Sequence, residues 1–255
     1  MMGLSLRSRE RLIGLLSPAV LLLLWELFAR IGWIDQRFFP APSSIVTTFV
    51  ELSRSGELWT NLSASLMRLF WGCLLGGIPA LLLGLAMGLY RPVRALIDPL
   101  VAATYPIPKS AILPLVLLIF GLGEGSKIAM VALGVFYPMI INTTAGVLEI
   151  DRIYLDVGKN FGASRWQTFR TIALPGAAPL IMAGMKLGAG MGLILIAIAE
   201  MIGAQSGIGY MIWNAWQVFQ VEKMYVGLLV TAILGFGTAI LLNWLERVLI
   251  PWKAH

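Results

Sequence analysis

The sequence predicts an all-α polytopic membrane protein with about six transmembrane helices, and three observations support this fold class. Hydrophobic residues make up 58% of the 255 residues and charged residues only 13%, against roughly 45–50% and 25% in an ordinary soluble domain. The mean hydropathy is +0.84. Six segments stay apolar over the length of about 20 residues that a helix needs to cross the hydrocarbon core.

The same composition excludes several other classes of protein. A single cysteine, Cys73, excludes a disulfide scaffold, and His255 as the lone histidine leaves no basis for a metal cluster or a catalytic triad. The net charge of +6 is not gathered into a long basic run, so we expect no nucleic acid partner. In a membrane protein such charge is typical of the cytoplasmic side. We therefore predict no catalytic residues, no metal site and no bound cofactor.

The six predicted spans cover residues 12–31, 63–90, 96–120, 126–148, 176–203 and 225–249. The first resembles a signal peptide only superficially, because Pro18 and Glu26 interrupt its apolar run and no small-residue cleavage site follows it before Trp33. We interpret it as a retained span. With the N-terminus inside, the cytoplasmic segments carry eleven lysines and arginines and the outer segments six. This asymmetry predicts a multi-pass membrane protein with both termini in the cytoplasm.

Glycines in the second and fifth spans recur at an interval that favours close helix packing. Gly72–Gly76, Gly84–Gly88, Gly184–Gly188 and Gly188–Gly192 are each four residues apart. Such spacing places the glycines on one helix face and lets two backbones approach. We expect these glycines to serve packing.

The third span contains a cluster of prolines that a continuous helix would not tolerate. Pro106, Pro108 and Pro114 fall within nine residues, with Lys109 and Ser110 between them. Proline removes a backbone hydrogen bond and clashes with the preceding turn. Irregular backbone at membrane depth is tolerated when it is buried in protein or lines a cavity. We predict a broken helix beside a translocation pathway, with Lys109 attracting an anionic solute.

Two ionisable residues, Lys186 and Glu200, lie in the fifth span. They are 14 residues apart, about 21 Å along an ideal helix, so they cannot pair directly. They share one stripe of the helix, which favours a polar face along the pathway. The alternatives are that Lys186 extends toward the cytoplasmic interface and that Glu200 hydrogen-bonds a neighbouring span. Gln205 and Ser206 follow in a glycine-rich turn and offer uncharged polar contacts.

The cytoplasmic loop 149–175 is predicted to form two short helices. Asp151 can cap the first helix, and Gly162 separates the first helix from the second. Ser164 precedes Gln167 by three residues, which is a capping-box pattern that opens the second helix. We expect Leu174-Pro175 to end that helix and to begin the fifth span.

Aromatic residues in this loop have no local core in which to be buried. Trp166 and Phe169 lie on the second short helix. Such a helix either lies on the membrane surface or enters a groove on another protein. The pattern leaves both alternatives open.

The loop resembles the signature loop of the inner-membrane permease subunits of ABC importers. That family's pattern is Glu-Ala-Ala, three residues, Gly, nine residues and Ile-x-Leu-Pro. Here Asp156-Val-Gly stands for the first three residues, and the rest is retained as Gly162 and Ile172-x-Leu174-Pro175. Three further segments, Pro106–Gly123, Ile141–Thr143 and Ala199–Tyr210, resemble the branch that imports sulfonates, taurine, nitrate or bicarbonate.

The resemblance implies a type I ABC importer permease architecture, with residues 1–255 as a single permease domain and 149–175 as its coupling loop. It implies four kinds of partner: a second permease copy forming a homodimer, two cytoplasmic ATPase subunits, an extracytoplasmic solute-binding protein and the lipid bilayer. ATP would bind in the partner subunit, because Gly121–Lys127 lacks the spacing of a phosphate loop. The implied location is the bacterial inner membrane, and the implied solute is small and anionic.

Two sets of candidate residues follow. Those expected at the ATPase-coupling surface are Asp156, Gly162, Ser164, Arg165, Trp166, Phe169, Ile172, Leu174 and Pro175. Those expected along the pathway are Pro106, Pro108, Lys109, Ser110, Lys186, Glu200, Gln205 and Ser206. The alternative function is a self-sufficient channel or secondary transporter, which would usually show a second copy of the broken segment. A membrane scaffold is a third class, although it would not explain a polar stripe and a docking loop.

Overall fold

The computed structural model describes residues 6–252, with side chains from residue 16 onward except those of Arg152, Leu155 and Arg165. Every regular element in this part of the chain is helical. In chain order the helices are α1 (Leu6–Arg30), α2 (Pro42–Arg54), α3 (Glu57–Leu89), α4 (Arg91–Thr104), α5 (Leu113–Phe120), α6 (Glu124–Leu148), α7 (Arg152–Asn160), α8 (Arg165–Thr168), α9 (Leu174–Met201), α10 (Ile208–Gln217) and α11 (Val221–Leu249). A 3-10 turn, Lys109–Ile112, precedes α5, and a π-helical segment, Phe169–Ala173, joins α8 to α9.

Long apolar helices account for most of the predicted spans. Four stretches are long and apolar enough to cross a membrane: Glu57–Leu89, Glu124–Leu148, Trp166–Met201 and Val221–Leu249. A fifth is obtained if α4 and the bent segment that follows it count as one span. Helix α1 covers the predicted span 12–31, but its described side chains begin at residue 16 and it is not among these stretches. The fold class is confirmed, whereas the count of six spans is not.

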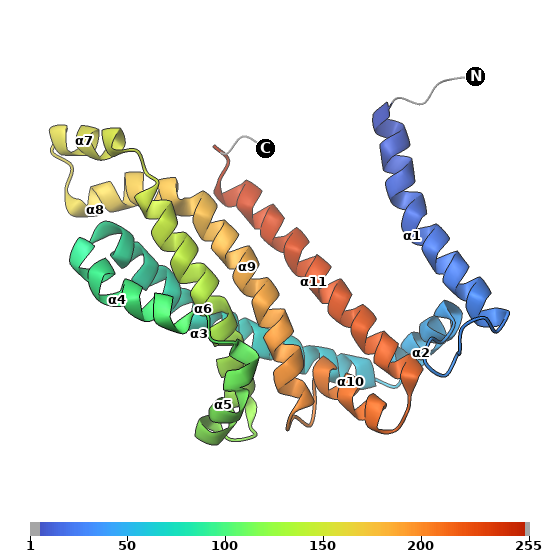
Figure 1. Cartoon of the computed structure of the whole chain (residues 1–255). Helices are drawn as coiled ribbons and strands as arrows, with labels where there is room; N and C mark the ends of the chain where they lie inside the picture. The colour runs from blue at the N-terminus through green and yellow to red at the C-terminus, as the bar shows by residue number, and fades with distance from the viewer. Residues whose placement is uncertain (1–5, 253–255) are drawn as a thin grey trace.

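Helix α6 lies between α3 and α9 and forms the centre of the bundle (Figure 1). Glycines on both neighbours allow close contact with it. A Cβ added at Gly76 of α3 would overlap the backbone of Ala132, and one at Gly184 of α9 would lie 3.0 Å from the carbonyl oxygen of Pro138. The spaced glycines therefore pack helices, as predicted. Around these contacts lies a buried apolar cluster that includes Ala80, Leu85, Met139, Ile140 and Ile181.

The predicted third span is broken, as the proline cluster indicates. Helix α4 ends at Thr104, and the segment Lys109–Phe120 leaves at 88° to it. The chain turns at Pro106 and Pro108, where the missing N–H groups prevent the helix from continuing. At 14 and 8 residues, α4 and α5 are each too short to cross the hydrocarbon core alone.

Two helices at the other side of the bundle were not predicted. Helices α2 and α10 lie near one another at the end of the bundle to which α5 also points (Figure 1). Helix α1 stands apart from the bundle along most of its length and approaches it at its C-terminal end. There Trp25 lies 5.6 Å from the ring of Tyr225 on α11, and Glu26 accepts a hydrogen bond from the Ser43 N–H of α2.

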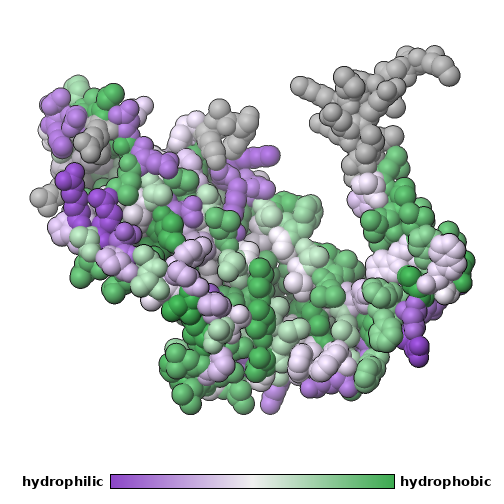
Figure 2. All heavy atoms as spheres, in the orientation of Figure 1, coloured by the Kyte–Doolittle hydropathy of each residue, from purple (hydrophilic) through white to green (hydrophobic). Residues whose placement is uncertain are grey.

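The two ends of the bundle are chemically distinct from its middle. Helices α7 and α8 mark one end, which we call the hairpin end, and α10 marks the other, the α10 end. The start of α1 and the last turn of α11 lie on the same side as the hairpin (Figure 1). Hydrophilic residues gather around the hairpin, whereas hydrophobic residues cover much of the middle and α5 (Figure 2). This distribution is typical of a protein that lies across a bilayer.

Two adjacent glycines provide a test of the α3–α6 contact. We expect Gly76→Ala to destabilise the protein by about 1–3 kcal/mol, because its Cβ would meet backbone atoms that cannot move aside. Gly77→Ala is the matched control, since its Cβ would lie 3.6 Å from a Val135 methyl group, an ordinary contact. Thermal unfolding of the two purified variants in detergent measures the difference. Equal melting temperatures would contradict the packing argument.

Candidate functional site

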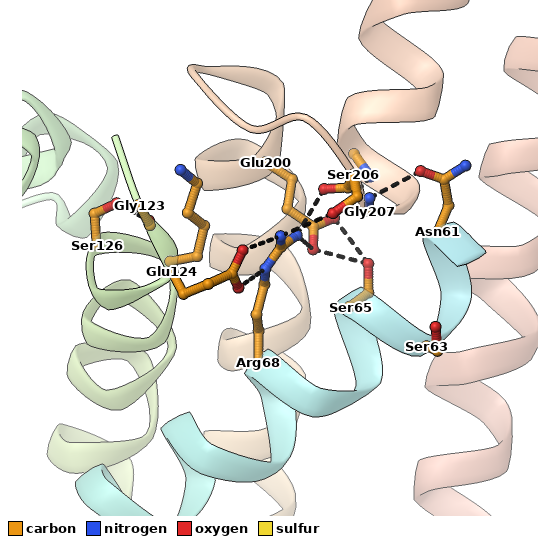
Figure 3. Close-up of polar contacts among 12 residues, drawn as sticks. Asn61, Ser63, Ser65, Arg68, Gly123, Glu124, Ser126, Glu200, Ser206 and Gly207 are labelled. Carbon is orange, nitrogen blue, oxygen red and sulfur yellow. Dashed lines mark hydrogen bonds and ion pairs between the residues drawn. The ribbon is translucent and has the colours of Figure 1, made fainter. Parts of the chain in front are cut away.

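A buried arginine joins the three central helices at the α10 end. Arg68 of α3 is 2% exposed and lies between two carboxylates (Figure 3). Its Nη1 donates to Glu200 of α9 at 2.8 Å. Its Nε and Nη2 donate to the two carboxylate oxygens of Glu124 at 2.6 and 2.7 Å. The Ser206 carbonyl and hydroxyl oxygens accept from Nη1 and Nη2 at 2.7 and 3.1 Å, so all five guanidinium donors have acceptors.

The carboxylate of Glu200 is held on several sides. It is 1% exposed, and a buried charge is costly unless it is paired and hydrogen-bonded. Besides Arg68, the Ser65 hydroxyl lies 2.8 Å from both carboxylate oxygens, and the Gly209 N–H donates at 2.9 Å. The alternative in which Glu200 hydrogen-bonds a neighbouring span is therefore confirmed, since Ser65 and Arg68 both lie on α3.

The same cluster fixes the start of α10 against α3. The Gly207 N–H donates to Asn61 Oδ1 and the Ile208 N–H donates to Ser65 Oγ, both at 2.9 Å. Gly207 has a φ of +119°, and a Cβ there would overlap the carboxylate of Glu200. Only glycine fits this position, because both its backbone conformation and the close approach exclude a side chain.

A second buried cation, Lys127, ties two loops together near this cluster. It is 1% exposed, and its Nζ donates to the carbonyl oxygens of Leu122 and Gly203. Together with Arg68 and the two glutamates, it gives the cluster a formal charge of zero. In the described part of the chain, no three His, Cys, Asp or Glu side chains come together as a possible metal site.

Sequence analysis missed most members of this cluster, including its central arginine. It named Glu200 and Ser206 but neither Arg68 nor Glu124. Arg68 lies within the predicted span 63–90, and an ionisable residue inside a span indicates function by the rule already applied to Lys186. That signal was available. No such signal indicated the role of Glu124, because its contact with Arg68 depends on the packing of α6 beside α3. Gln205 lies in the same turn as Ser206.

The predicted residue Lys109 caps α4. Its Nζ donates to the carbonyl oxygens of Thr104, Tyr105 and Ile107 at 3.0, 2.8 and 2.8 Å, which uses its three donors. It also lies 4.1 Å from the ring centroid of Tyr137. A cavity of about 220 Å³ lies beside it. The remaining predicted residues of this segment are close to Lys109 in the chain. Pro106 and Pro108 lie in the turn before it, and Ser110 is the next residue.

Lys186 forms an ion pair with Glu246 and so joins α9 to α11. The Lys186 side chain is 31% exposed and that of Glu246 10%. Among the contacts of the described residues, none joins Lys186 to Lys109 or to Glu200. The candidate pathway residues therefore lie in three separate places.

At the hairpin end, the predicted helix caps are present. Asp151 Oδ1 accepts from the Ile153 N–H at 3.0 Å at the start of α7. At the start of α8, the Ser164 N–H donates to Gln167 Oε1 at 2.8 Å, and the Gln167 N–H donates to Ser164 Oγ at 3.2 Å. The capping box is confirmed, and it orders a helix too short to be stable alone.

Two glycines shape the turn between α7 and α8. Gly162 has a φ of +69°, in open space, so the left-handed backbone alone requires glycine. Gly158 is buried, and a Cβ there would lie 3.0 Å from Ile172 Cδ1. The ABC permease pattern has alanine at this position, and an alanine here would require the Ile172 methyl group to move by a few tenths of an ångström. Asp156 forms an exposed pair with Lys159 at 3.5 Å, which contributes little stability.

The hairpin exposes large apolar side chains, although not all of those expected. Trp166 is 65% exposed, Tyr154 63% and Phe161 86%. Phe169 is different: it is half-buried against the central apolar cluster. The expectation that both Trp166 and Phe169 protrude is therefore wrong for Phe169, because the π-helical segment that begins with it packs onto the bundle.

The second short helix does not stop at Leu174-Pro175, which corrects the prediction. The backbone continues from α8 through the π-helical segment into α9. The Leu174 N–H donates to the Phe169 carbonyl five residues back, the hydrogen bond of a π-helix. Pro175, which has no N–H to donate, lies in the first turn of α9, directly after this π-helical segment. The side chain of Arg165, also predicted here, lies outside the described residues.

Comparisons with known proteins agree with this arrangement. Residues 80–254 match the family described as binding-protein-dependent transport system inner membrane component. The chain belongs to this family. Three similar curated proteins are permeases by name: two proteins named for aliphatic sulfonates transport, SsuC of Bacillus subtilis (35% identical) and SsuC of Escherichia coli (37%), and the taurine transport system permease TauC of Escherichia coli (34%). They align with 94, 92 and 97% of this chain and with 87, 90 and 92% of their own lengths.

A solved structure shows the same fold. A chain of the MetNI methionine ABC transporter in inward-facing conformations superposes with a TM-score of 0.57 and 20% sequence identity, covering 75% of this chain and 94% of that one. This permease is thus a membrane component of an ABC transport system with the type I importer fold. The family match includes the hairpin and α9, whereas Arg68 lies before it.

The central ion pair predicts a specific double-variant result. We expect Arg68→Met to destabilise this permease by about 3–5 kcal/mol, because Glu200 would be left buried without its counter-ion. Arg68→Met combined with Glu200→Met should recover most of that loss, since neither member of this buried pair is then left without its counter-ion. Chemical or thermal unfolding in detergent gives the comparison. A double variant as unstable as the sum of the single variants would refute the pairing argument.

The turn of the hairpin predicts a second result. We expect Gly162→Val to cost about 1–2 kcal/mol of local stability, because a β-branched residue is strained at this φ. Gly162→Asn is the control, since asparagine tolerates the left-handed region better than other side chains. Hydrogen exchange of the α7 and α8 amides reports the local opening. Protection unchanged in both variants would show that the backbone at residue 162 is not constrained.

Proposed function

We propose that this permease forms the pathway of an ATP-driven importer for small organic sulfonates, with a separate ATPase acting on its α7–α8 hairpin. The observation that carries the coupling role is the hairpin itself. It is ordered by a side-chain cap and a capping box, yet it exposes Trp166 and Phe161. A rigid apolar surface of this kind is suited to a groove on a partner protein.

The proposed orientation places the hairpin end in the cytoplasm. Under this orientation the excess of lysine and arginine lies on the cytoplasmic side, as is usual. The start of α1 and the end of α11 then lie on that side too. The α10 end would face a solute-binding protein on the outside.

The proposed solute class derives support from the relatives. Two proteins with 35 and 37% identity are named for aliphatic sulfonates transport, and one with 34% identity for taurine transport. Taurine is itself a short sulfonate, so one chemical class covers all three names. The pathway roles of Lys109 and Lys186 remain part of this proposal.

Assembly with a second copy is also proposed. Helix α5 exposes Leu118 to 82% and Ile119 to 66%, and these side chains need lipid or protein around them.

A self-sufficient channel is the alternative function, but it leaves the capped apolar hairpin without a role.

Uptake is the direct test of the proposed function. Proteoliposomes containing this permease, its cognate ATPase and its solute-binding protein should accumulate a short alkanesulfonate when ATP is present. Accumulation without ATPase or ATP would favour the channel instead.

The hairpin surface can be tested separately. We expect Trp166→Ala to weaken binding of the cognate ATPase at least about tenfold, since a buried aromatic at an interface typically contributes 2 kcal/mol or more. Trp33→Ala is the matched control, because Trp33 is also exposed, to 76%, and lies outside the hairpin. Pull-down of the ATPase from detergent extracts measures both. Equal binding by the two variants would exclude Trp166 from the interface.

A further inference from the structure

The carboxylates on either side of Arg68 differ in how firmly they are held. Glu200 is 1% exposed and has contacts from Ser65 and Gly209 in addition to the arginine. The Glu124 side chain is 66% exposed, and its hydrogen bonds to protein are those from Arg68 among the described contacts. Glu200 is therefore a fixed counter-ion, and Glu124 is a counter-ion that can swing away into water.

The Nε–Nη2 edge of Arg68 is the edge that Glu124 occupies. Two parallel N–H donors in a plane bind two oxygens of any carboxylate or sulfonate. Ser206 Oγ accepts a hydrogen bond from Nη2 at 3.1 Å. The Ser206 hydroxyl group can rotate, so its O–H can donate to a third oxygen. Displacement of Glu124 would thus expose a site with three donors, which matches the three oxygens of a sulfonate.

A cavity adjoins this edge. Its volume is about 510 Å³, and its lining includes Arg68, Glu124 and Ser206. The remainder of the lining includes Met67, which is 62% exposed, and Trp71, which is 46% exposed. Polar donors at one side and apolar side chains at the other suit a charged head with a short hydrocarbon tail.

We propose that this cavity is the site at which the permease receives its solute, with the anionic head of an alkanesulfonate replacing Glu124 on the Nε–Nη2 edge of Arg68. This inference rests on the proposed function, since it assigns a place to that solute at the α10 end. In the unloaded state Glu124 acts as a tethered substitute for the ligand. It keeps the buried arginine paired while the cavity is empty.

The charge balance of the cluster explains why such an exchange is feasible. Arg68 and Lys127 contribute two positive charges, and Glu200 and Glu124 two negative ones. When the ligand's anion replaces Glu124 on the arginine, the number of charges in contact with Arg68 does not change. The released carboxylate remains at the surface, where water solvates it.

Binding of 1-butanesulfonate to the purified permease in nanodiscs of zwitterionic lipid tests the proposal. Trp71 lines the cavity, so tryptophan fluorescence reports occupancy. We expect Glu124→Gln to bind 1-butanesulfonate at least tenfold more tightly than wild type, because the competing carboxylate is gone. Glu57→Gln is the matched control, since Glu57 pairs with Lys223 at 2.5 Å outside the cavity, and its affinity should equal that of wild type.

Further variants separate the possible outcomes. Trp71→Phe should abolish most of the fluorescence change while calorimetry still detects binding. If Glu124→Gln is unstable, Glu124→Ala replaces it with the same expected gain. Affinity that is unchanged or lower in the Glu124 variants overturns the proposal. A fluorescence response that is absent in zwitterionic nanodiscs and appears only when phosphatidylglycerol is added also overturns it, because it would indicate a lipid headgroup. ATP-driven uptake is measured separately, so an importer that works with no gain in Glu124→Gln would refute this site and leave the proposed function intact.

Discussion

The close contact of α6 with α3 and α9 is the constraint on which the other features depend. If positions 76 and 184 carried a side chain in place of glycine, that side chain would push these helices apart. Arg68, Glu124 and Glu200 come from three different helices, so their hydrogen bonds of 2.6–2.8 Å exist only at this spacing. Close packing by small residues, which in lipid replaces much of the hydrophobic driving force, thereby also sets the geometry of a charged cluster.

The two ends of the long helix α9 lie in different chemical environments. At the α10 end, α9 terminates at a carboxylate that must be neutralised because it is buried. At the hairpin end, the helix that becomes α9 starts on a capping box in water. Polar groups are paired internally at one end and exposed in a fixed arrangement at the other.

Features that depend on local chemistry could be predicted from the sequence. The helix caps at Asp151 and Ser164, the interruption at Gly162 and the break near Pro106 each follow from a few neighbouring residues, and the structure has all of them. The family followed from the spacing between Gly162 and Pro175.

Features that depend on partners distant in sequence could not be predicted in this way. Lys186 pairs with Glu246, 60 residues away, and Arg68 meets Glu200, 132 residues away. Periodicity places each residue on a helix face, but it does not say which helix that face meets. The continuation of α8 into α9 was missed for another reason, since proline usually marks a helix boundary and the π-helical segment removes that conflict.

The π-helical segment Phe169–Ala173 also determines the direction in which the hairpin faces. A π-helical turn contains about one residue more than an α-helical turn. Each residue of an α-helix rotates the chain by about 100°, since a turn contains 3.6 residues. If the same five residues were α-helical, Trp166 would point about a quarter-turn away around the α9 axis, because each residue of a π-helix rotates the chain by less than 100°. The direction of the exposed tryptophan therefore depends on the π-helical geometry of the five residues between Thr168 and Leu174.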